Sequence, residues 1–107
     1  IKFYKEADLF ILSSVYEGFP NVLVEAAQNN VPIISTNCNS GPREILLNGK
    51  GGELVKVRDH LRISQKIELF SKNKKNFTKK SQFCKKKLYR FDNKHNLLRF
   101  EKLFYKL

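Results

Sequence analysis

Short apolar segments alternate with polar loops over the first half of the chain, in an order that predicts a βαβ unit. Residues 8–13 form an almost continuously apolar run, typical of a strand buried on both faces of a parallel sheet. Pro20 suits the first turn of a helix over 21–29, and residues 32–36 form a second buried strand. This order predicts a parallel sheet in an α/β fold. The helix is expected to bury Val22, Leu23, Ala26 and Ala27.

The second half of the chain has no Gly or Pro after Gly52, which favours helices. Asp59 can cap the first long helix. The apolar positions of the two long helices are Leu61, Ile67 and Phe70, then Phe77, Phe83, Cys84 and Leu88. In chain order we expect a short helix over 42–47, a turn over 48–52, an edge strand over 53–57, helices over 59–72 and 76–89, and an amphipathic helix over 97–107.

Length and charge divide the chain without splitting it into domains. Its 107 residues suffice for one small domain, with an α/β core over 1–57 and a basic helical part over 58–107. The core carries a net charge of −1 and the helical part +12, which together give +11. No apolar run approaches the roughly 20 residues of a membrane span. Because the chain has no Met and begins at Ile1, we expect a processed piece, an excised fragment or the product of a truncated gene.

The residues that most often bind metals or act as nucleophiles are scattered. Cys38 and Cys84 lie far apart, as free thiols in a reducing cytoplasm would. Cys38 is expected to be incidental in a loop, and Cys84 to be a small apolar residue of a helix. His60 and His95 each lack a carboxylate or thiol at catalytic spacing, so both are read as surface residues. The pattern predicts no metal site.

The segment from Glu17 to Glu25 combines two carboxylates with the start of a predicted helix. Glu17 follows the first strand, and Glu25 lies eight residues later in the helix. Ligands of doubly wound sheets bind outside the carboxyl ends of the strands, and helix N-termini attract phosphate groups. Carboxylates accept pairs of hydrogen bonds from sugar hydroxyls. The pattern therefore suits a nucleotide sugar, with its diphosphate at the helix start and the two acids on the flanking sugars.

This segment resembles the Glu-x7-Glu motif of the retaining glycosyltransferases of family 4, also called group 1 glycosyltransferases. The resemblance covers essentially the whole chain and is strongest over residues 4–57. It implies the C-terminal, donor-binding half of the two-domain GT-B fold, which is a Rossmann-like parallel sheet, with extra C-terminal helices. The matching segments are 16–27, Pro-Ile-Ile-Ser-Thr-Asn at 32–37, Gly-Pro-Arg-Glu-Ile at 41–45, Gly-Gly-Glu-Leu-Val at 51–55, and the terminal stretch 91–105.

The resemblance implies a role for each residue of the motif. Glu17 is expected to touch and position the donor sugar, as the catalytic contact of the site. Glu25 is expected to bind the ribose hydroxyls of the nucleotide. The loop and helix start, whose backbone amides approach the sugar and the diphosphate, comprise Gly18, Phe19, Pro20, Asn21, Val22 and Leu23. The implied reaction moves a hexose-type residue from a nucleotide-sugar donor, with UDP favoured by its frequency in the family, and it needs no metal or other cofactor.

The resemblance also implies partners and a location. The family's acceptor-binding N-terminal domain and its phosphate-binding Arg and Lys lie upstream of the residues present, so the isolated chain is expected to be inactive. Acceptors in the family include lipid-linked and envelope glycans. We therefore expect a cytoplasmic protein, peripheral at the inner face of the membrane. The residues do not determine the donor sugar, the acceptor, the linkage or the oligomeric state.

Each feature also has a plainer interpretation. Glu17 can be an exposed loop acid, Glu25 a salt-bridge partner on its helix, and Arg43 either a phosphate contact or the partner of a neighbouring acid. The basic part 58–107 can be no more than solvated helix faces. It can also make the chain a basic module that binds an anionic membrane surface, with nucleic acid less favoured because no recognition motif is present. An inert product of a truncated gene is the third alternative.

Overall fold

The computed structural model describes residues 7–15, 20–38 and 41–91 of the chain. Element boundaries follow the predicted ones within about two residues in most places, and the helix predicted over 97–107 lies outside the described residues. In this part of the chain the elements are β1 (Phe10–Leu12), α2 (Asn21–Gln28), β2 (Ile33–Thr36), α3 (Gly41–Ile45), the 3₁₀ turn η1 (Leu47–Gly49), β3 (Glu53–Val55), α4 (His60–Lys72), α5 (Lys74–Lys86) and the 3₁₀ turn η2 (Leu88–Phe91).

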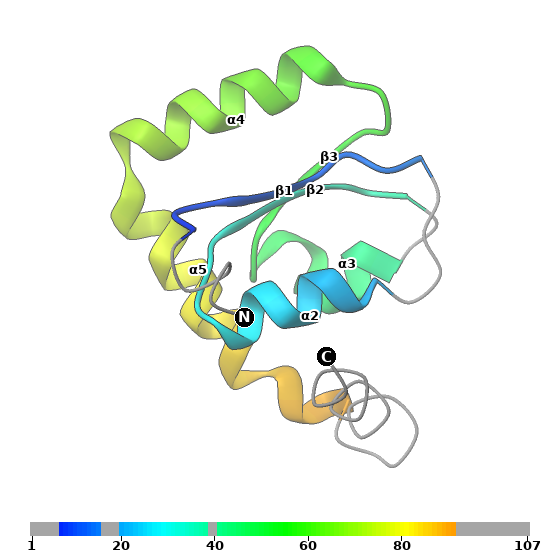
Figure 1. The fold of residues 1–107 in the computed structure, drawn as a ribbon, viewed down its shortest axis with the longest axis vertical. Coiled ribbons are helices and arrows are strands. Elements are labelled where there is room, and N and C mark those ends of the chain that lie inside the picture. The colour runs from blue at the N-terminus through cyan, green and yellow to red at the C-terminus, as the bar shows by residue number, and fades with distance from the viewer. Residues whose placement is uncertain (1–6, 16–19, 39–40, 92–107) are drawn as a thin grey trace.

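The strands form one parallel sheet in the order β1-β2-β3. Phe10 lies opposite Ile33, and Ile34 lies opposite Glu53. Helices α2 and α3 lie on one face of this sheet, and α4 lies on the other face, where it contacts β3 (Figure 1). Helix α5 follows α4 after Asn73 and packs against α2. This layered arrangement confirms the predicted α/β class with a parallel sheet.

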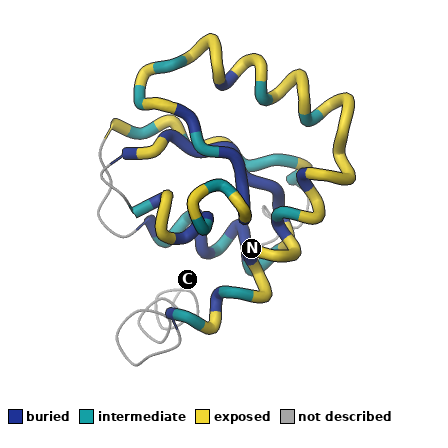
Figure 2. The backbone as a smooth tube through the Cα atoms, turned by 180° about the vertical axis from the view of Figure 1, so that it is seen from behind, coloured by how far each residue is buried: buried dark blue, intermediate teal, exposed yellow. Residues whose placement is uncertain are grey.

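The core lies between the sheet and α2. Burial is greatest along β2 and the inner side of α2, whereas the outer side of α4 is exposed (Figure 2). The predicted stripe of α2 is confirmed for three of its four residues, but Val22 is only partly buried and Val24 is buried in its place. The core cluster comprises Leu23, Val24, Ala26, Ala27, Val31, Ile33, Ile45, Leu46, Cys84, Leu88 and Phe91.

Caps and turns begin and end the helices as local chemistry requires. The Asp59 side chain accepts a hydrogen bond of 3.0 Å from the backbone amide of Arg62 and so caps α4, as predicted. After α2 the chain turns at Asn30, whose φ of 58° is left-handed, a conformation that Asn tolerates. These local signals place the boundaries of α2 and α4 near their predicted positions.

An ion triad joins the two long helices to the sheet. Glu53 of β3 is only 8% exposed, and its two carboxylate oxygens lie 2.7 Å from Nζ of Lys66 in α4 and 2.5 Å from Nζ of Lys80 in α5. Burial alone raises the pKa of Glu53. Hydrogen bonds and charge from the two lysines outweigh that effect, so the pKa lies below its usual value. The carboxylate therefore stays ionised and holds both helices.

Backbone contact at Gly51 brings α5 against the turn before β3. A Cβ atom at Gly51 would lie 2.9 Å from Cβ and 3.3 Å from Cα of Cys84, closer than packed atoms approach. The Cys84 thiol donates a weak hydrogen bond of 3.5 Å to the carbonyl of Ile45, and burial raises its pKa to about 11. Cys84 is thus the small buried residue that the sequence predicted. It fits there because Gly51 has no side chain.

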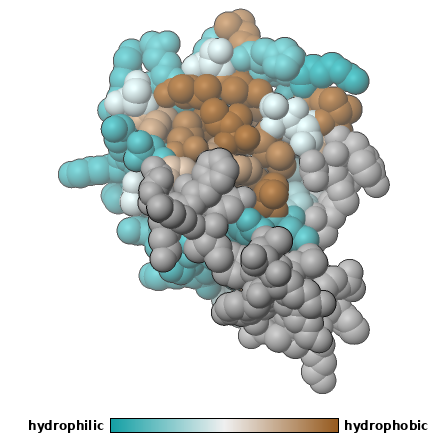
Figure 3. All heavy atoms as spheres, in the orientation of Figure 1, coloured by the Kyte–Doolittle hydropathy of each residue, from teal (hydrophilic) through white to brown (hydrophobic). Residues whose placement is uncertain are grey.

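The expectation that the first strand is buried on both faces is wrong, and three of the apolar side chains named on the long helices are exposed. Strand β1 is not buried on both faces, because Ile11 is 38% exposed. Within the described residues β1 pairs with β2 alone. Figure 3 shows apolar side chains gathered on this side of the sheet next to α4. Leu61 is 71% exposed and Ile67 is also exposed, because α4 rests on β3 through Ile63. Phe83 is exposed because Phe77, Ser81, Cys84 and Leu88 occupy the inner side of α5.

Candidate functional site: the carboxyl edge of the sheet

Two helix N-termini meet the carboxyl ends of the strands. Because the strands are parallel, β1, β2 and β3 all end at one edge of the sheet, called here the carboxyl edge. The loop after β1 leads to the start of α2, and the loop after β2 leads to the start of α3 (Figure 1). This is the place where doubly wound sheets bind their ligands.

A side chain that the sequence did not single out ties this edge together. Thr36, at the end of β2, is 1% exposed, and its hydroxyl donates a 2.6 Å hydrogen bond to the carbonyl of Ser14 in the loop after β1. The next amide, that of Asn37, donates a 2.8 Å bond to the carbonyl of Val55 at the end of β3. The ends of all three strands are therefore linked, which fixes where the loop toward α2 leaves the sheet.

The N-terminus of α2 has no side-chain cap. Pro20 occupies the cap position with φ −79° and ψ 84°, and its side chain offers no hydrogen-bond acceptor. No acidic residue lies in the first turn of α2. The amide of Leu23 donates to the carbonyl of Pro20 at 3.0 Å, and the Leu23 side chain is fully buried in the core. The partial positive charge of this helix end is therefore not offset by residues of α2 itself, which favours an anion beside it.

Glu25 lies on the second turn of α2 and is partly buried. Its carbonyl accepts a 2.8 Å hydrogen bond from the side-chain amide of Asn29. Within the described residues its carboxylate forms no ion pair, so the structure does not support reading Glu25 as a salt-bridge partner on its helix. A partly buried carboxylate to which the described residues offer no ion partner can accept hydrogen bonds from a ligand.

The residues of the predicted site fall into two groups, one inside and one outside the described part of the chain. Helix α2 carries Asn21, Val22, Leu23 and Glu25, and Pro20 lies at the cap position before it. Glu17, Gly18 and Phe19 lie outside the described residues. How the motif acids stand relative to each other therefore stays a prediction.

Helix α3 begins at the carboxyl edge, and its other end is held by a hydrogen bond from η2. The Arg90 guanidinium of η2 donates a 2.8 Å hydrogen bond to the carbonyl of Glu44, near the end of α3. Arg43 is exposed and has no carboxylate partner within the described part of the chain. Pro42 and Ile45 anchor α3 in the interior. This role of Arg90 was not anticipated, since the carbonyl of Glu44 lies more than forty residues away in the sequence.

The described residues offer little other chemistry. They contain no cluster of three His, Cys, Asp or Glu side chains able to hold a metal ion. Cys38 is buried in the loop after β2, and His60 is exposed at the start of α4, whereas His95 lies outside the described residues. None of the helices in the described ranges has the length and apolarity needed to cross a membrane.

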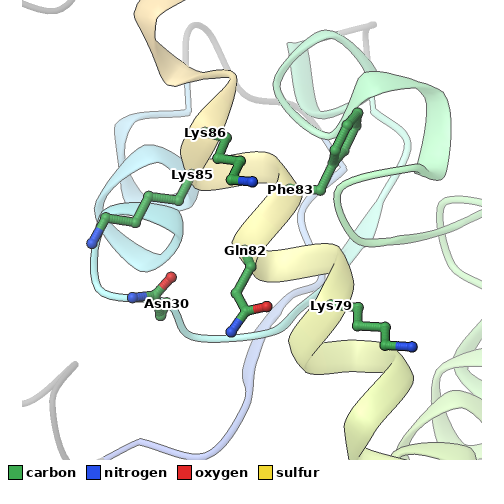
Figure 4. Close-up of a pocket in the computed structure, with 6 residues that line it drawn as sticks. All are labelled: Asn30, Lys79, Gln82, Phe83, Lys85 and Lys86. Carbon is green, nitrogen blue, oxygen red and sulfur yellow. The ribbon is translucent and has the colours of Figure 1, made fainter.

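A pocket of about 570 Å³ lies along the outer side of α5 (Figure 4). One of its residues, Asn30, lies between α2 and the start of β2, so the pocket lies toward the amino end of the sheet, away from the carboxyl edge. It is therefore separate from the candidate site. Its described lining residues are Asn30, Lys79, Gln82, Phe83, Lys85 and Lys86.

Comparison with known proteins places the chain in one family. Residues 1–90 match the sequence profile of the family described as glycosyl transferases group 1, so the chain belongs to that family. The C-terminal domain of a group 1 glycosyl transferase (LpcC) from Francisella tularensis has a similar fold, with a TM-score of 0.73 and 24% identity. That match covers 82% of this chain and 45% of the solved chain.

Two relatives carry the similarity at the sequence level. An uncharacterized glycosyltransferase of Methanocaldococcus jannaschii is 53% identical over 45 residues, which are 42% of this chain and 11% of that protein. The capsular polysaccharide biosynthesis glycosyltransferase CapM of Staphylococcus aureus is 38% identical over 68 residues, which are 64% of this chain and 18% of that protein. The chain thus spans less than a fifth of the length of either relative.

Proposed function

We propose that this chain forms the nucleotide-sugar-binding part of a retaining glycosyltransferase. The observation that supports it most is the uncapped N-terminus of α2 at the carboxyl edge, with partly buried Glu25 on the next turn, whose carboxylate forms no ion pair with another described residue. A helix N-terminus attracts a diphosphate, and a carboxylate accepts hydrogen bonds from adjacent ribose hydroxyls. The donor is then a nucleoside diphosphate sugar, with UDP as the first candidate.

Each residue of the motif has a proposed role in positioning the donor. Glu17 orients the sugar, Glu25 binds the ribose, and the backbone from Gly18 to Leu23 faces the sugar and the diphosphate. Fixing the donor in a reactive geometry lowers the barrier without a covalent step on this chain. We propose no metal or other cofactor, since the helix start can balance the phosphate charge and the sequence contains no Asp-x-Asp pair.

The partner and acceptor follow from the same proposal. An N-terminal acceptor-binding domain would complete the cleft, since the residues described build only the donor side. The acceptor is a lipid-linked or envelope glycan, a proposal supported by the name of the S. aureus relative, which concerns capsular polysaccharide biosynthesis. An enzyme with such an acceptor works in the cytoplasm at the inner face of the membrane, to which it attaches peripherally.

A titration of UDP and UDP-sugars tests the donor site. Amide chemical shifts should move at residues 21–25 and not along α4. Glu25→Gln should weaken UDP binding at least tenfold, because a charged acceptor of ribose hydroxyls is lost, each such hydrogen bond being worth about 1.5–3 kcal/mol. The matched control is Glu68→Gln, since Glu68 is an exposed acid of α4 whose partner is Lys72. Shifts confined to other elements, or equal losses in the two variants, would contradict the proposal.

A second candidate function is a basic module on an α/β scaffold. It is supported by residues 69–91, which contain nine basic residues and no acidic one. Binding to anionic vesicles or to duplex DNA, with no response to any UDP-sugar at millimolar concentration, would favour this function over donor binding.

A further inference from the structure

We infer that the outer side of α5 is the surface that docks this chain on an anionic phospholipid membrane. The inference rests on the peripheral attachment proposed above and assigns it to one surface. That surface, called here the α5 face, consists of Lys75, Lys79, Gln82, Phe83, Lys85 and Lys86.

The packing of α5 determines which side chains point outward. Phe77, Ser81, Cys84 and Leu88 are buried at spacings of four, three and four residues, which define the inner side of the helix. The Ser81 hydroxyl donates to the carbonyl of Thr78 at 2.9 Å and lies 3.4 Å from the carbonyl of Asn30, at the end of α2. Since α5 cannot rotate without breaking this packing, Lys75, Lys79 and Lys86 remain on the opposite side.

The described residues do not compensate the charge on this surface. Of the nine basic residues over 69–91, Lys72 and Lys80 pair with Glu68 and Glu53. Within the described residues the four lysines of the α5 face form no ion pair. A cluster of unpaired lysines produces a positive potential that attracts anionic lipid headgroups.

Aromatic exposure favours a membrane over a nucleic acid. Phe83 is 36% exposed and lines the pocket together with Lys79, Lys85 and Lys86 (Figure 4). The Lys87 ammonium lies 5.5 Å from the centre of its ring. Tyr89, which follows in η2, is 67% exposed. Lysine stems and aromatic rings suit the boundary between headgroups and acyl chains. The sequence carries no motif for base recognition, so DNA would be held by charge alone.

The location of the surface is compatible with catalysis. The α5 face lies toward the amino end of the sheet, and the carboxyl edge with the start of α2 lies at the other end (Figure 1). A membrane against α5 therefore leaves the proposed donor edge uncovered. Donor binding and membrane docking can be measured separately on the same chain.

Vesicle binding of the full 107-residue chain tests the inference. Vesicles of phosphatidylcholine, alone or with phosphatidylglycerol, are sedimented with the wild type and with K75Q/K79Q/K86Q. Each lysine near an anionic surface strengthens binding about fivefold, so the triple variant should bind about 100-fold more weakly. The matched control K56Q/R58Q/R62Q removes the same charge at the start of α4, and it should bind nearly as the wild type does. Phe83→Trp adds a fluorophore, whose emission should shift to the blue on anionic vesicles.

Each result supports or overturns the inference. Selective loss in the α5 triple variant, with a blue shift at position 83, supports it. Equal loss in both triple variants, an unshifted emission, or tighter binding of duplex DNA than of anionic vesicles overturns the assignment of this surface. If the wild type binds no vesicle at all, the peripheral attachment fails as well, whereas the donor site is judged by UDP titration alone. All six substituted positions are exposed, so both triple variants should fold, which circular dichroism verifies.

Discussion

Replacing Glu53 by Gln tests whether the ion triad holds α4 and α5 on the sheet. The side chain keeps its shape and one acceptor oxygen but loses the charge that lies 2.7 Å from Lys66 and 2.5 Å from Lys80. Hydrogen bonds to charged groups contribute about 1.5–3 kcal/mol, and removing one member of a buried pair costs about 3–5 kcal/mol. Because both lysines keep partial contact with water, we expect a loss of about 2 kcal/mol at neutral pH, near the lower of these ranges.

The pH dependence of that loss gives the sharper test. The pKa of Glu53 is lower in the folded chain than its usual value of 4.5, so the folded state is stabilised above that pH. The stabilisation must disappear as the pH falls through the lowered folded pKa. Urea unfolding of the wild type and Glu53→Gln from pH 7 to pH 2.5 should therefore show two free energies of unfolding that converge at acidic pH. Glu68→Gln, at an exposed pair on α4, is the control and should not differ from the wild type.

Two outcomes would refute this reasoning. Equal stability of Glu53→Gln and the wild type at pH 7 would mean that desolvation of the triad cancels its attraction. A difference that persists unchanged to pH 2.5 would mean that packing, and not charge, accounts for it. In either case the attachment of α5, and with it the orientation of its lysines, would depend on the apolar contacts of its inner side alone.

Three further changes test other parts of the fold and site. Gly51→Ala should destabilise the chain by about 1–3 kcal/mol in urea unfolding, because its Cβ would meet Cys84 at 2.9 Å and α5 must move. Asp59→Ala should cost about 1 kcal/mol and speed amide exchange in the first turn of α4, whereas Asp59→Asn should keep most of the cap. Thr36→Val should cost about 1–2 kcal/mol and weaken UDP binding, because the carbonyl of Ser14 loses its 2.6 Å donor.

Each of these has a result that contradicts it. Unchanged stability of Gly51→Ala would mean that α5 stands further from the turn than the structure places it. Equal exchange rates in the Ala and Asn variants at position 59 would remove the cap as the cause. If Thr36→Val unfolds more easily but binds UDP as the wild type does, then the link between the strand ends serves the fold and not the donor site.

The sequence predicted those features that local chemistry determines. Pro20 and Asp59 mark the starts of helices through their own backbone or side-chain preferences, and the structure confirms a helix start at each. The segment Pro-Ile-Ile-Ser-Thr at 32–36 predicted a buried strand, and every residue of β2 is buried. The family motif likewise depends on short spacings, so it could be recognised before any fold was known.

Contacts between distant segments could not be predicted in the same way. Glu53 in a three-residue strand shows no sign of its two lysines, which come from helices 13 and 27 residues later. Thr36 could have been suspected as a polar residue at the end of a buried strand, but its partner Ser14 lies in another loop. The exposure of Leu61 and Ile67 in α4 could not be predicted either. Periodicity shows that a helix has an apolar side but not how much of that side a neighbour covers.

The lysines of the α5 face and the candidate site lie toward opposite ends of the sheet, and this bears on the function of each. If the lysines existed to bind a nucleotide diphosphate, they should gather where the strands end, but the unpaired ones of the α5 face lie toward the other end of the sheet. The carboxyl edge instead offers the N-terminus of α2, which can hold phosphate through backbone amides. Amides carry no net charge and form no ion pair with a neighbouring carboxylate, so Glu25 can remain an acceptor for hydroxyls beside the phosphates. A lysine within reach of that carboxylate would pair with it and compete with the ligand, as Lys66 and Lys80 pair with Glu53. A basic surface on the far side of the chain avoids that competition and leaves its charge available for another partner.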